Sequence, residues 1–329
     1  MLAFLPATVL AQDLTDLSTI RVESRLVLVD VIPEAQDTKL HSPALITDLT
    51  REDFRLFDNR AEMPIASFDA GTMRNTQPIA LWLIVQCPQG FLPGWASDFL
   101  KGDAHLLRPA LAHLDSNDVV GVAHWCDNGE AAIDLLPGRA PDAAVASLEQ
   151  ILHRRVARGD MRVVELAMQK LVRILLENVH NTQPERLPVL VFFYGDRCAT
   201  RAEEAEKIIE DVHETSGMVF GISDGKWPYD PSSQMANGYV DYLVHHYSQE
   251  TGGEYYTTPD PKLYSAAFDY ILSQLHLRYT LGFKPRVLDG KRHSLKVELT
   301  PAAQKRYQGF NLRFRKVYIP IARQAVASP

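Results

Sequence analysis

The sequence has few cysteines and none of the spacings that usually group them into a site. Its 329 residues include three, Cys87, Cys126 and Cys198, and no CxxC or HExxH pattern. Three thiols so far apart exclude a disulfide-rich scaffold and allow at most one internal disulfide. The P-loop and the G-x-G-x-x-G pattern of nucleotide-binding proteins are also absent. We therefore expect a protein that is not an enzyme and that holds no cofactor.

Blocks of like charge and long uncharged stretches are missing as well. The 34 Lys and Arg and 41 Asp and Glu residues are interspersed, with a formal net charge of −7. Without a basic stripe, nucleic acid is not an expected partner. Beyond the N-terminus no uncharged stretch approaches the roughly 20 residues of a membrane helix, so we expect no membrane span in the mature chain. The 46% of hydrophobic residues is typical of a globular protein with one or two domains.

The first residues are apolar and end in the manner of a signal peptide. Residues 1–12 are largely apolar and close with Val9, Leu10 and Ala11 before the polar Gln12. We interpret 1–17 as a signal peptide remnant and expect an exported protein, periplasmic or secreted. No Lys or Arg precedes the apolar run, so a start further upstream or a buried N-terminal segment stays open as an alternative.

Both ends of the chain have the alternating pattern of β-strands. We expect an N-terminal β module over 18–72, with which C-terminal strands in 276–322 pair to form one sandwich-like domain. A hairpin is expected around Asn59. The segments with the strand pattern are 20–32, 55–58, 64–68, 278–283, 294–299 and 311–321.

Between the two ends the pattern changes to continuous apolar runs separated by amphipathic stretches. Strands that are apolar on both faces are typical of a parallel sheet covered by helices. The order predicts an α/β fold with a doubly wound, mostly parallel sheet over 75–275. The expected strands are 79–85, 119–125, 189–194 and 218–222, and the expected helices are 162–177, 264–277 and one that begins at Thr200.

Four short motifs follow one another along the chain. They are LTREDFRLFDN at 49–59, TGGEYY at 251–256, YTLGFKP at 279–285 and DGKRHSLKV at 289–297. In this order they resemble the LT-x-EDF-x-L-x-DG, TGG-x-x-Y, Y-x-LGY-x-P and DGK-x-H-x-LKV segments of von Willebrand factor A-related proteins common in acidobacteria. The resemblance covers nearly the whole mature chain and implies a Rossmann-like domain of the von Willebrand factor A type.

The resemblance also implies a metal-ion-dependent adhesion site, from which this sequence departs. Metal-binding A domains have D-x-S-x-S after the first sheet strand, a Thr in a later loop and an Asp after the central strand, oxygen ligands that suit a hard divalent cation. Here Val85, Cys87 and Gln89 stand at the first three positions, and near the other two only Asp160 and Asp196 carry charge. We expect a degenerate site without bound metal.

The cysteines provide an alternative at the same place. Cys87, Cys126 and Cys198 each follow an expected strand, on the edge where open α/β sheets bind ligands. With His124 and Asp127 they are candidates for a soft-metal site that takes Zn²⁺ or Cu, or for a redox-active thiol pair. Plain packing is the interpretation we favour, because cysteine often fills apolar space, and a disulfide stays open. A Cys–His hydrolase is disfavoured, since residues i and i+2 of a strand lie about 7 Å apart.

The segment 226–247 is unusually rich in aromatic residues. If exposed, Trp227, Tyr229 and Tyr239 form a contact surface for a partner; a core-facing helix stripe in 242–247 is the alternative. We predict a non-enzymatic module that binds another protein or a surface ligand at the upper edge of the sheet. The alternatives are a thiol or soft-metal site on that edge, or a structural scaffold or assembly protein. No pattern indicates the oligomeric state.

Overall fold

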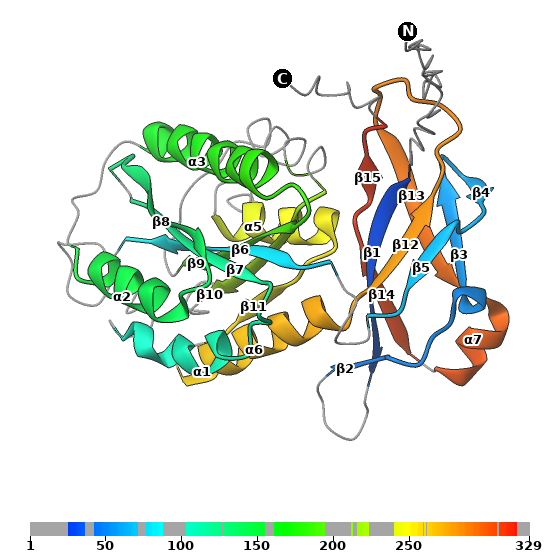
Figure 1. The fold of residues 1–329 in the computed structure, drawn as a ribbon, viewed down its shortest axis with the longest axis horizontal. Helices are drawn as coiled ribbons and strands as arrows, with labels where there is room; N and C mark the ends of the chain where they lie inside the picture. The colour runs from blue at the N-terminus through cyan, green and yellow to red at the C-terminus, as the bar shows by residue number, and fades with distance from the viewer. Residues whose placement is uncertain are drawn as a thin grey trace, which may run out of the picture.

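The computed structural model has an α/β part and a part made of antiparallel sheets (Figure 1). Helix α6 (Lys262–His276) runs from the first part toward the second. In the part of the chain that the structure describes, no helix is long and apolar enough to cross a membrane. The described residues are 26–36, 43–71, 77–87, 103–126, 128–154, 161–194, 212, 216–223, 240–258, 260, 262–307 and 309–320.

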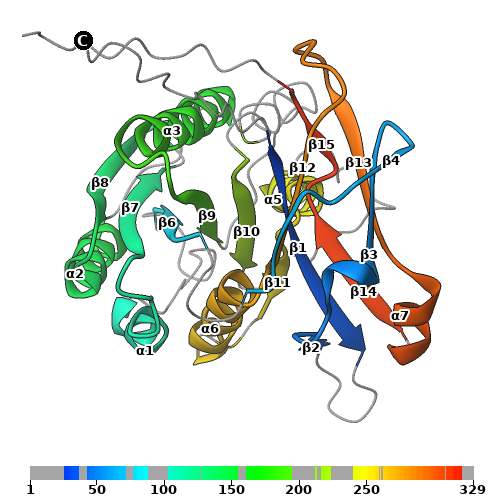
Figure 2. The same cartoon turned by 45° about the vertical axis from the view of Figure 1, so that its right-hand side comes forward.

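A six-stranded mixed sheet forms the centre of the α/β part. Its order is β11-β10-β9-β6-β7-β8, and of these six strands β8 is antiparallel to its neighbour (Figure 2). The doubly wound, mostly parallel sheet is therefore confirmed, and its strand order reverses between β6 and β9. The strands are β6 (Ile79–Gln86), β7 (Val119–Trp125), β8 (Ala131–Gly138), β9 (Leu187–Tyr194), β10 (Met218–Ser223) and β11 (Tyr255–Thr257).

Helices cover both faces of this sheet (Figure 1). α3 (Met161–Thr182) and α5 (Val240–Thr251) pack on one face, and α2 (Pro141–Leu152) and α6 on the other, with η3 (Ala104–Leu107) and α1 (Arg108–Leu111). Every residue of β6 and β9 is buried, because successive side chains enter the two apolar cores in turn. α3 and α6 confirm the helices expected at 162–177 and 264–277. The helix expected from Thr200 lies outside the described residues, apart from Val212.

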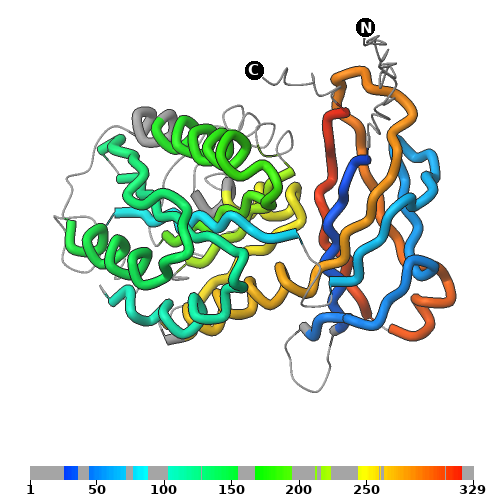
Figure 3. The backbone as a smooth tube through the Cα atoms, viewed as in Figure 1, coloured from blue at the N-terminus to red at the C-terminus, as the bar shows by residue number. Residues whose placement is uncertain are grey.

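Strands from both ends of the chain pair in the second part (Figure 3). β1 (Val27–Gln36) lies antiparallel between β12 (Tyr279–Phe283) and β14 (Phe310–Phe314), and β3 (Phe54–Asp58) pairs with β13 (His293–Leu299). Side chains from these strands share one apolar core. The other elements are β2 (Pro43–Leu45), β4 (Ala61–Met63), β5 (Ser67–Asp69), β15 (Val317–Tyr318), η1 (Arg51–Asp53) and α7 (Pro301–Arg306).

The hairpin expected around Asn59 has a different second strand. β3 turns through Asn59 and Arg60, whose φ angles are +46° and +71°, and pairs with β4 rather than with 64–68. Two consecutive residues at positive φ form the two-residue turn whose twist matches antiparallel strands. Such a short loop requires the partner strand to begin at once, so the predicted pairing was wrong. Residues Ser67–Asp69 form β5 and pair with β12 instead.

The two parts meet at the amino-terminal ends of the parallel strands. The buried guanidinium of Arg278 contacts Asp30 of β1 (Nε to Oδ1, 3.0 Å) and donates to the carbonyl of Gln77, just before β6 (2.7 Å). After α5, Gly252 has a φ of +85° and packs against the backbone of Phe314 in β14. Since Gln77 and Gly252 precede β6 and β11, the carboxyl-terminal edge of the sheet lies at the end away from the antiparallel sheets.

Candidate functional site

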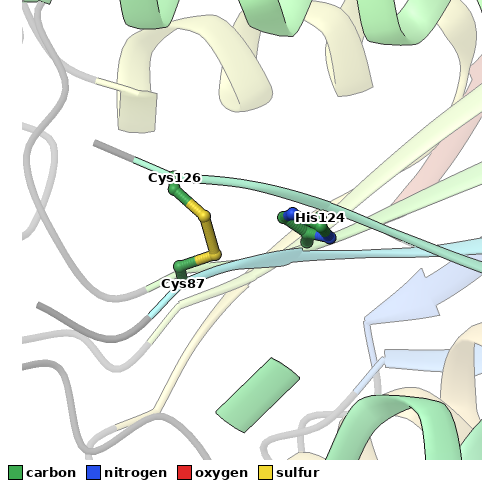
Figure 4. A group of neighbouring side chains, drawn as sticks. All are labelled: Cys87, His124 and Cys126. Atoms are coloured by element: carbon green, nitrogen blue, oxygen red, sulfur yellow. A yellow bond between two sulfur atoms is a disulfide. The ribbon is translucent and has the colours of Figure 1, made fainter. Parts of the chain in front are cut away.

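A disulfide lies at the carboxyl-terminal edge of β6, β7, β9 and β10, here called the rim. β6 and β7 are in register with Gln86 beside Trp125, so the residues that follow, Cys87 and Cys126, are also neighbours. Their Cα atoms are 4.8 Å apart and their sulfur atoms are bonded (Figure 4). Both residues are buried, at 2% and 0% exposure. Of the alternatives for these cysteines, the structure contains the disulfide, whereas packing as free thiols is excluded for this pair.

His124 lies on the same face of β7 as Cys126 but is held by other groups. Its Nδ1 is 2.6 Å from Oδ2 of Asp134 in β8, and its Nε2 is 2.9 Å from Nη1 of Arg154, just after α2. A guanidinium only donates, so this geometry assigns Nε2 as an acceptor and places the ring proton on Nδ1, which donates to Asp134. The Cys–His pair of a hydrolase is therefore not formed.

A tight turn brings a second carboxylate to the same place. The backbone N–H of Cys126 donates to the carbonyl of Glu130 (2.7 Å), which closes the turn between β7 and β8. Oε1 of Glu130 then lies 3.0 Å from Nη1 of Arg154 and 3.5 Å from Nε2 of His124. The other arginine nitrogen, Nη2, is 3.5 Å from Oδ1 of Asp134. The guanidinium thus sits among one imidazole nitrogen and two carboxylates.

The sequence predictions do not include Glu130, Asp134 and Arg154, because they do not include β8 and α2. The signal that was available is the pair Asn128-Gly129 between two apolar stretches, which favours a two-stranded hairpin. A hairpin there places residues 131–138 beside β7 and so brings an aspartate near His124. α2 begins at Pro141, the position where proline suits a helix start.

The first-loop positions do not have the chemistry of a magnesium site. Val85 lies within β6 and is fully buried in the core, and Gln86, at 1% exposure, is the last residue of the strand. An amide and a disulfide sulfur at Gln86 and Cys87 do not fit Mg²⁺, which requires octahedral oxygen ligands including a carboxylate. The other predicted site residues, Gln89, Asp127, Asp160, Asp196, Cys198, Trp227, Tyr229 and Tyr239, lie outside the described residues.

The aromatic segment 226–247 overlaps α5, and the described side chains of this helix fit the alternative in which it faces the core. Tyr247 is fully buried and packs in the core between α5, α3 and the sheet. His245 is half-buried, and burial together with the neighbouring His246 lowers its pKa. These residues therefore contribute to packing.

Residues 221–225 match the G-x-S-x-G pattern of serine hydrolases, which the predictions made above do not include. Ser223 is the last residue of β10 and is 4% exposed, and its hydroxyl lies 3.0 Å from the hydroxyl of Tyr255. A nucleophile elbow instead exposes its serine on a sharp turn after the strand and pairs it with a histidine. The buried strand position and the tyrosine partner do not fit that role.

An open, mostly apolar groove of about 530 Å³ runs between the edge strand β8 and α3. It begins at Gly129 in the rim turn, and Ile174 on α3 is 39% exposed. The lining residues of the groove are Gly129, Ala131, Ala132, Ile133, Ala167, Lys170, Leu171 and Ile174.

A second group of acidic and histidine side chains lies at the amino-terminal ends of the strands. The carboxylate of Asp118 accepts from the backbone N–H groups of Ile79 and Asp115 (both 3.0 Å) and lies 2.8 Å from Nε2 of His276. Burial alone raises the pKa of Asp118, but the hydrogen bonds from His276 and Ile79 outweigh it and the pKa is lowered. These bonds tie β6, the turn before β7 and α6 together, which is a structural role.

Comparisons with known proteins find distant likenesses only. No family model matches the chain, and no curated protein matches it significantly. Among solved structures it resembles an aerotolerance-related membrane protein from Bacteroides fragilis, at 14% identity and a TM-score of 0.43, over 60% of this chain and 98% of that one. It also resembles a von Willebrand factor type A protein from Catenulispora acidiphila, at 10% identity and 0.43, over 75% and 67%. The SpRpn10 VWA domain is similar at 11% and 0.42, over 57% and 93%.

Proposed function

We propose that this chain is an exported, non-enzymatic protein-binding module of the von Willebrand factor A type, with an adhesion site that has lost its metal ligands. Its partner is another protein or a surface ligand, bound at the rim without Mg²⁺. The observation that carries the proposal is the Cys87–Cys126 disulfide, which occupies the start of the first rim loop. The covalent link fixes Cys87 and Cys126 to each other at the ends of β6 and β7, where related metal-binding domains use a cation. The order of the four sequence motifs supports the proposed relation to the acidobacterial proteins of this type.

The disulfide also supports export. Disulfides persist in oxidising compartments outside the cytosol and are rare in cytosolic proteins. A chain purified without reductant is expected to have one free thiol after denaturation, that of Cys198. Three free thiols per chain would remove the support for both the linked strand ends and the export.

The second part of the chain is proposed as one sandwich-like module that holds the α/β domain from its amino-terminal edge. Support comes from the pairing of β1 with β12 and β14, and of β3 with β13, around one core. The domain limits 18–72, 75–275 and 276–322 belong to this proposal. In this arrangement the module leaves the rim accessible to a partner.

Photo-crosslinking in the native cells tests binding at the rim. A photo-reactive amino acid is placed at one position of the chain at a time. Asn128, exposed in the rim turn, is compared with Lys296, exposed on β13 at the far end of the molecule. We expect partner adducts from position 128 that persist in EDTA, and none from position 296. Adducts that EDTA abolishes, or adducts from position 296 alone, would contradict the proposal.

A further inference from the structure

We infer that reduction of the Cys87–Cys126 disulfide converts the rim into a zinc site, with Cys87, Cys126, His124 and Glu130 as ligands. This site is separate from the proposed binding function, which concerns the oxidised chain. Two thiolates, an imidazole and a carboxylate are a ligand set that Zn²⁺ takes in tetrahedral sites. The inference therefore makes the rim a place that holds either a disulfide or a metal ion.

Cys87, His124 and Cys126 already lie close enough together to bind one ion. One ligand atom from each of Cys87, His124 and Cys126 lies within 4.8 Å of the others, and all three side chains are buried (Figure 4). Zn–S distances of about 2.3 Å and Zn–N distances of about 2.0 Å place tetrahedral ligand atoms roughly 3.5 to 3.8 Å apart. Once the S–S bond is open, the two sulfur atoms separate to that distance, and the imidazole, which has a nitrogen within 4.8 Å of them, moves into the same range.

His124 has the orientation of a metal ligand. Asp134 accepts the Nδ1 proton at 2.6 Å and leaves Nε2 as the lone-pair nitrogen. A carboxylate that holds the second ring nitrogen of a ligating histidine is the common arrangement in zinc sites, because it fixes the tautomer and the ring. Asp134 is thus a positioning residue for the site.

Arg154 marks where the metal ion binds. Its guanidinium lies 2.9 Å from Nε2 of His124 and 3.0 Å from Oε1 of Glu130, so a positive charge already occupies the space between these two groups. The arginine side chain is 38% exposed and follows the end of α2, whereas His124 is 1% exposed. A half-exposed side chain can turn into solvent when Zn²⁺ takes its place. The turn from Cys126 to Glu130 holds the carboxylate of Glu130 near this position, where it serves as the fourth ligand.

The reductant that opens the disulfide is a dithiol. A dithiol gives two electrons and two protons to the S–S bond, which becomes two thiols, while the dithiol becomes a cyclic disulfide. Binding of Zn²⁺ then releases the two thiol protons and forms two Zn–S bonds. Oxidation by a small-molecule disulfide reverses the sequence: the Cys87–Cys126 bond forms again, the added disulfide takes up two electrons and two protons to become two thiols, and Zn²⁺ is released.

The experiment measures zinc in the purified full chain, in a Cys198→Ser background so that the third thiol cannot bind. The reduced protein is loaded with Zn²⁺ or Co²⁺ and desalted, and is compared with the oxidised protein. We expect about one metal ion per reduced chain and none per oxidised chain, as the four-ligand site implies. The Co²⁺ form should show thiolate-to-cobalt charge-transfer absorption and tetrahedral ligand-field bands.

Single substitutions distinguish metal bound at this site from metal bound adventitiously elsewhere on the chain. Cys126→Ser should abolish retention, and Asp134→Asn should weaken Zn²⁺ affinity by roughly 10- to 100-fold through the histidine. Arg154→Gln should strengthen it, because a competing cation is removed, and His276→Gln, in the group at the opposite edge, should leave it unchanged. Circular dichroism of each variant checks that it is folded.

Three results would overturn the inference. They are a reduced wild-type chain that retains no metal, equal retention by the oxidised chain, and a cobalt spectrum without thiolate bands.

Discussion

The rim and the junction between the two parts of the molecule differ in how deeply each buries its arginine side chain. The junction buries Arg278 completely and pairs it with Asp30, while the rim leaves Arg154 38% exposed beside an imidazole. The TGG segment at 251–253 also lies at the junction, where Gly252 packs against the backbone of Phe314, whereas the rim is closed by the Cys87–Cys126 disulfide. Buried pairing and close backbone packing therefore characterise the junction, and a covalent link characterises the rim.

Two of the sequence motifs contribute specific contacts to the antiparallel sheets. In DGKRH, His293 lies between two carboxylates, with Nδ1 2.8 Å from Asp58 and Nε2 3.2 Å from Asp289. Asp58 belongs to the first motif, at the end of β3, and also accepts from the hydroxyl of Tyr318 (3.0 Å). Residues from opposite ends of the chain thus meet in one buried network. Such a network stabilises the fold and carries no information about the partner.

Substitution of the two arginines, Arg278 at the junction and Arg154 at the rim, should produce the largest difference in stability between the two regions. Arg278→Gln leaves Asp30 and the carbonyl of Gln77 without their buried partner, and should lower the free energy of unfolding by about 3–5 kcal/mol. Arg154→Gln, at the half-exposed rim, should lower it by about 1 kcal/mol or less. Urea denaturation followed by circular dichroism measures both. Equal losses would remove the distinction between rim and junction.

A smaller effect is expected at two glycines with positive φ. Gly252 has a φ of +85°, and a Cβ there would lie 2.7 Å from backbone atoms of Phe314; Gly290 has a φ of +66°, with nothing within 4 Å. Gly290→Ala should lower the free energy of unfolding by the left-handed strain alone, about 1–2 kcal/mol. Gly252→Ala should lower it further, because the backbone of β14 must move. If thermal unfolding shows the same loss for both variants, the TGG turn does not depend on close contact with β14.

The sequence predicts most strands and helices of the described fold, but few of the contacts in the site. Continuous apolar runs such as 189–194 predict buried strands well, because both faces of a covered parallel strand must be apolar. β8 was missed since an edge strand has one partner, is half exposed and contains Asp134 and Pro137. The disulfide depends on the register of β6 and β7, which no local pattern specifies. Without β8 and α2, the partners of His124 could not be predicted either.

The smallest effect concerns Asp118, at the edge of the sheet opposite the rim. Its pKa lies below the ordinary value of 3.8, because hydrogen bonds from His276 and the N–H of Ile79 outweigh the effect of burial. The unfolded chain then binds this proton more readily than the folded chain, so the stabilisation is fully present above about pH 4 and is lost as the pH falls through the folded pKa. Asp118→Asn should therefore be less stable than the wild type at pH 7 and closer to it at pH 3.

The control for this prediction is Asp142→Asn, whose side chain is 81% exposed on α2. Because this carboxylate is exposed, its substitution should change the free energy of unfolding by only a small amount at pH 7. A wild-type acid dependence that persists unchanged in Asp118→Asn would place the responsible carboxylate elsewhere.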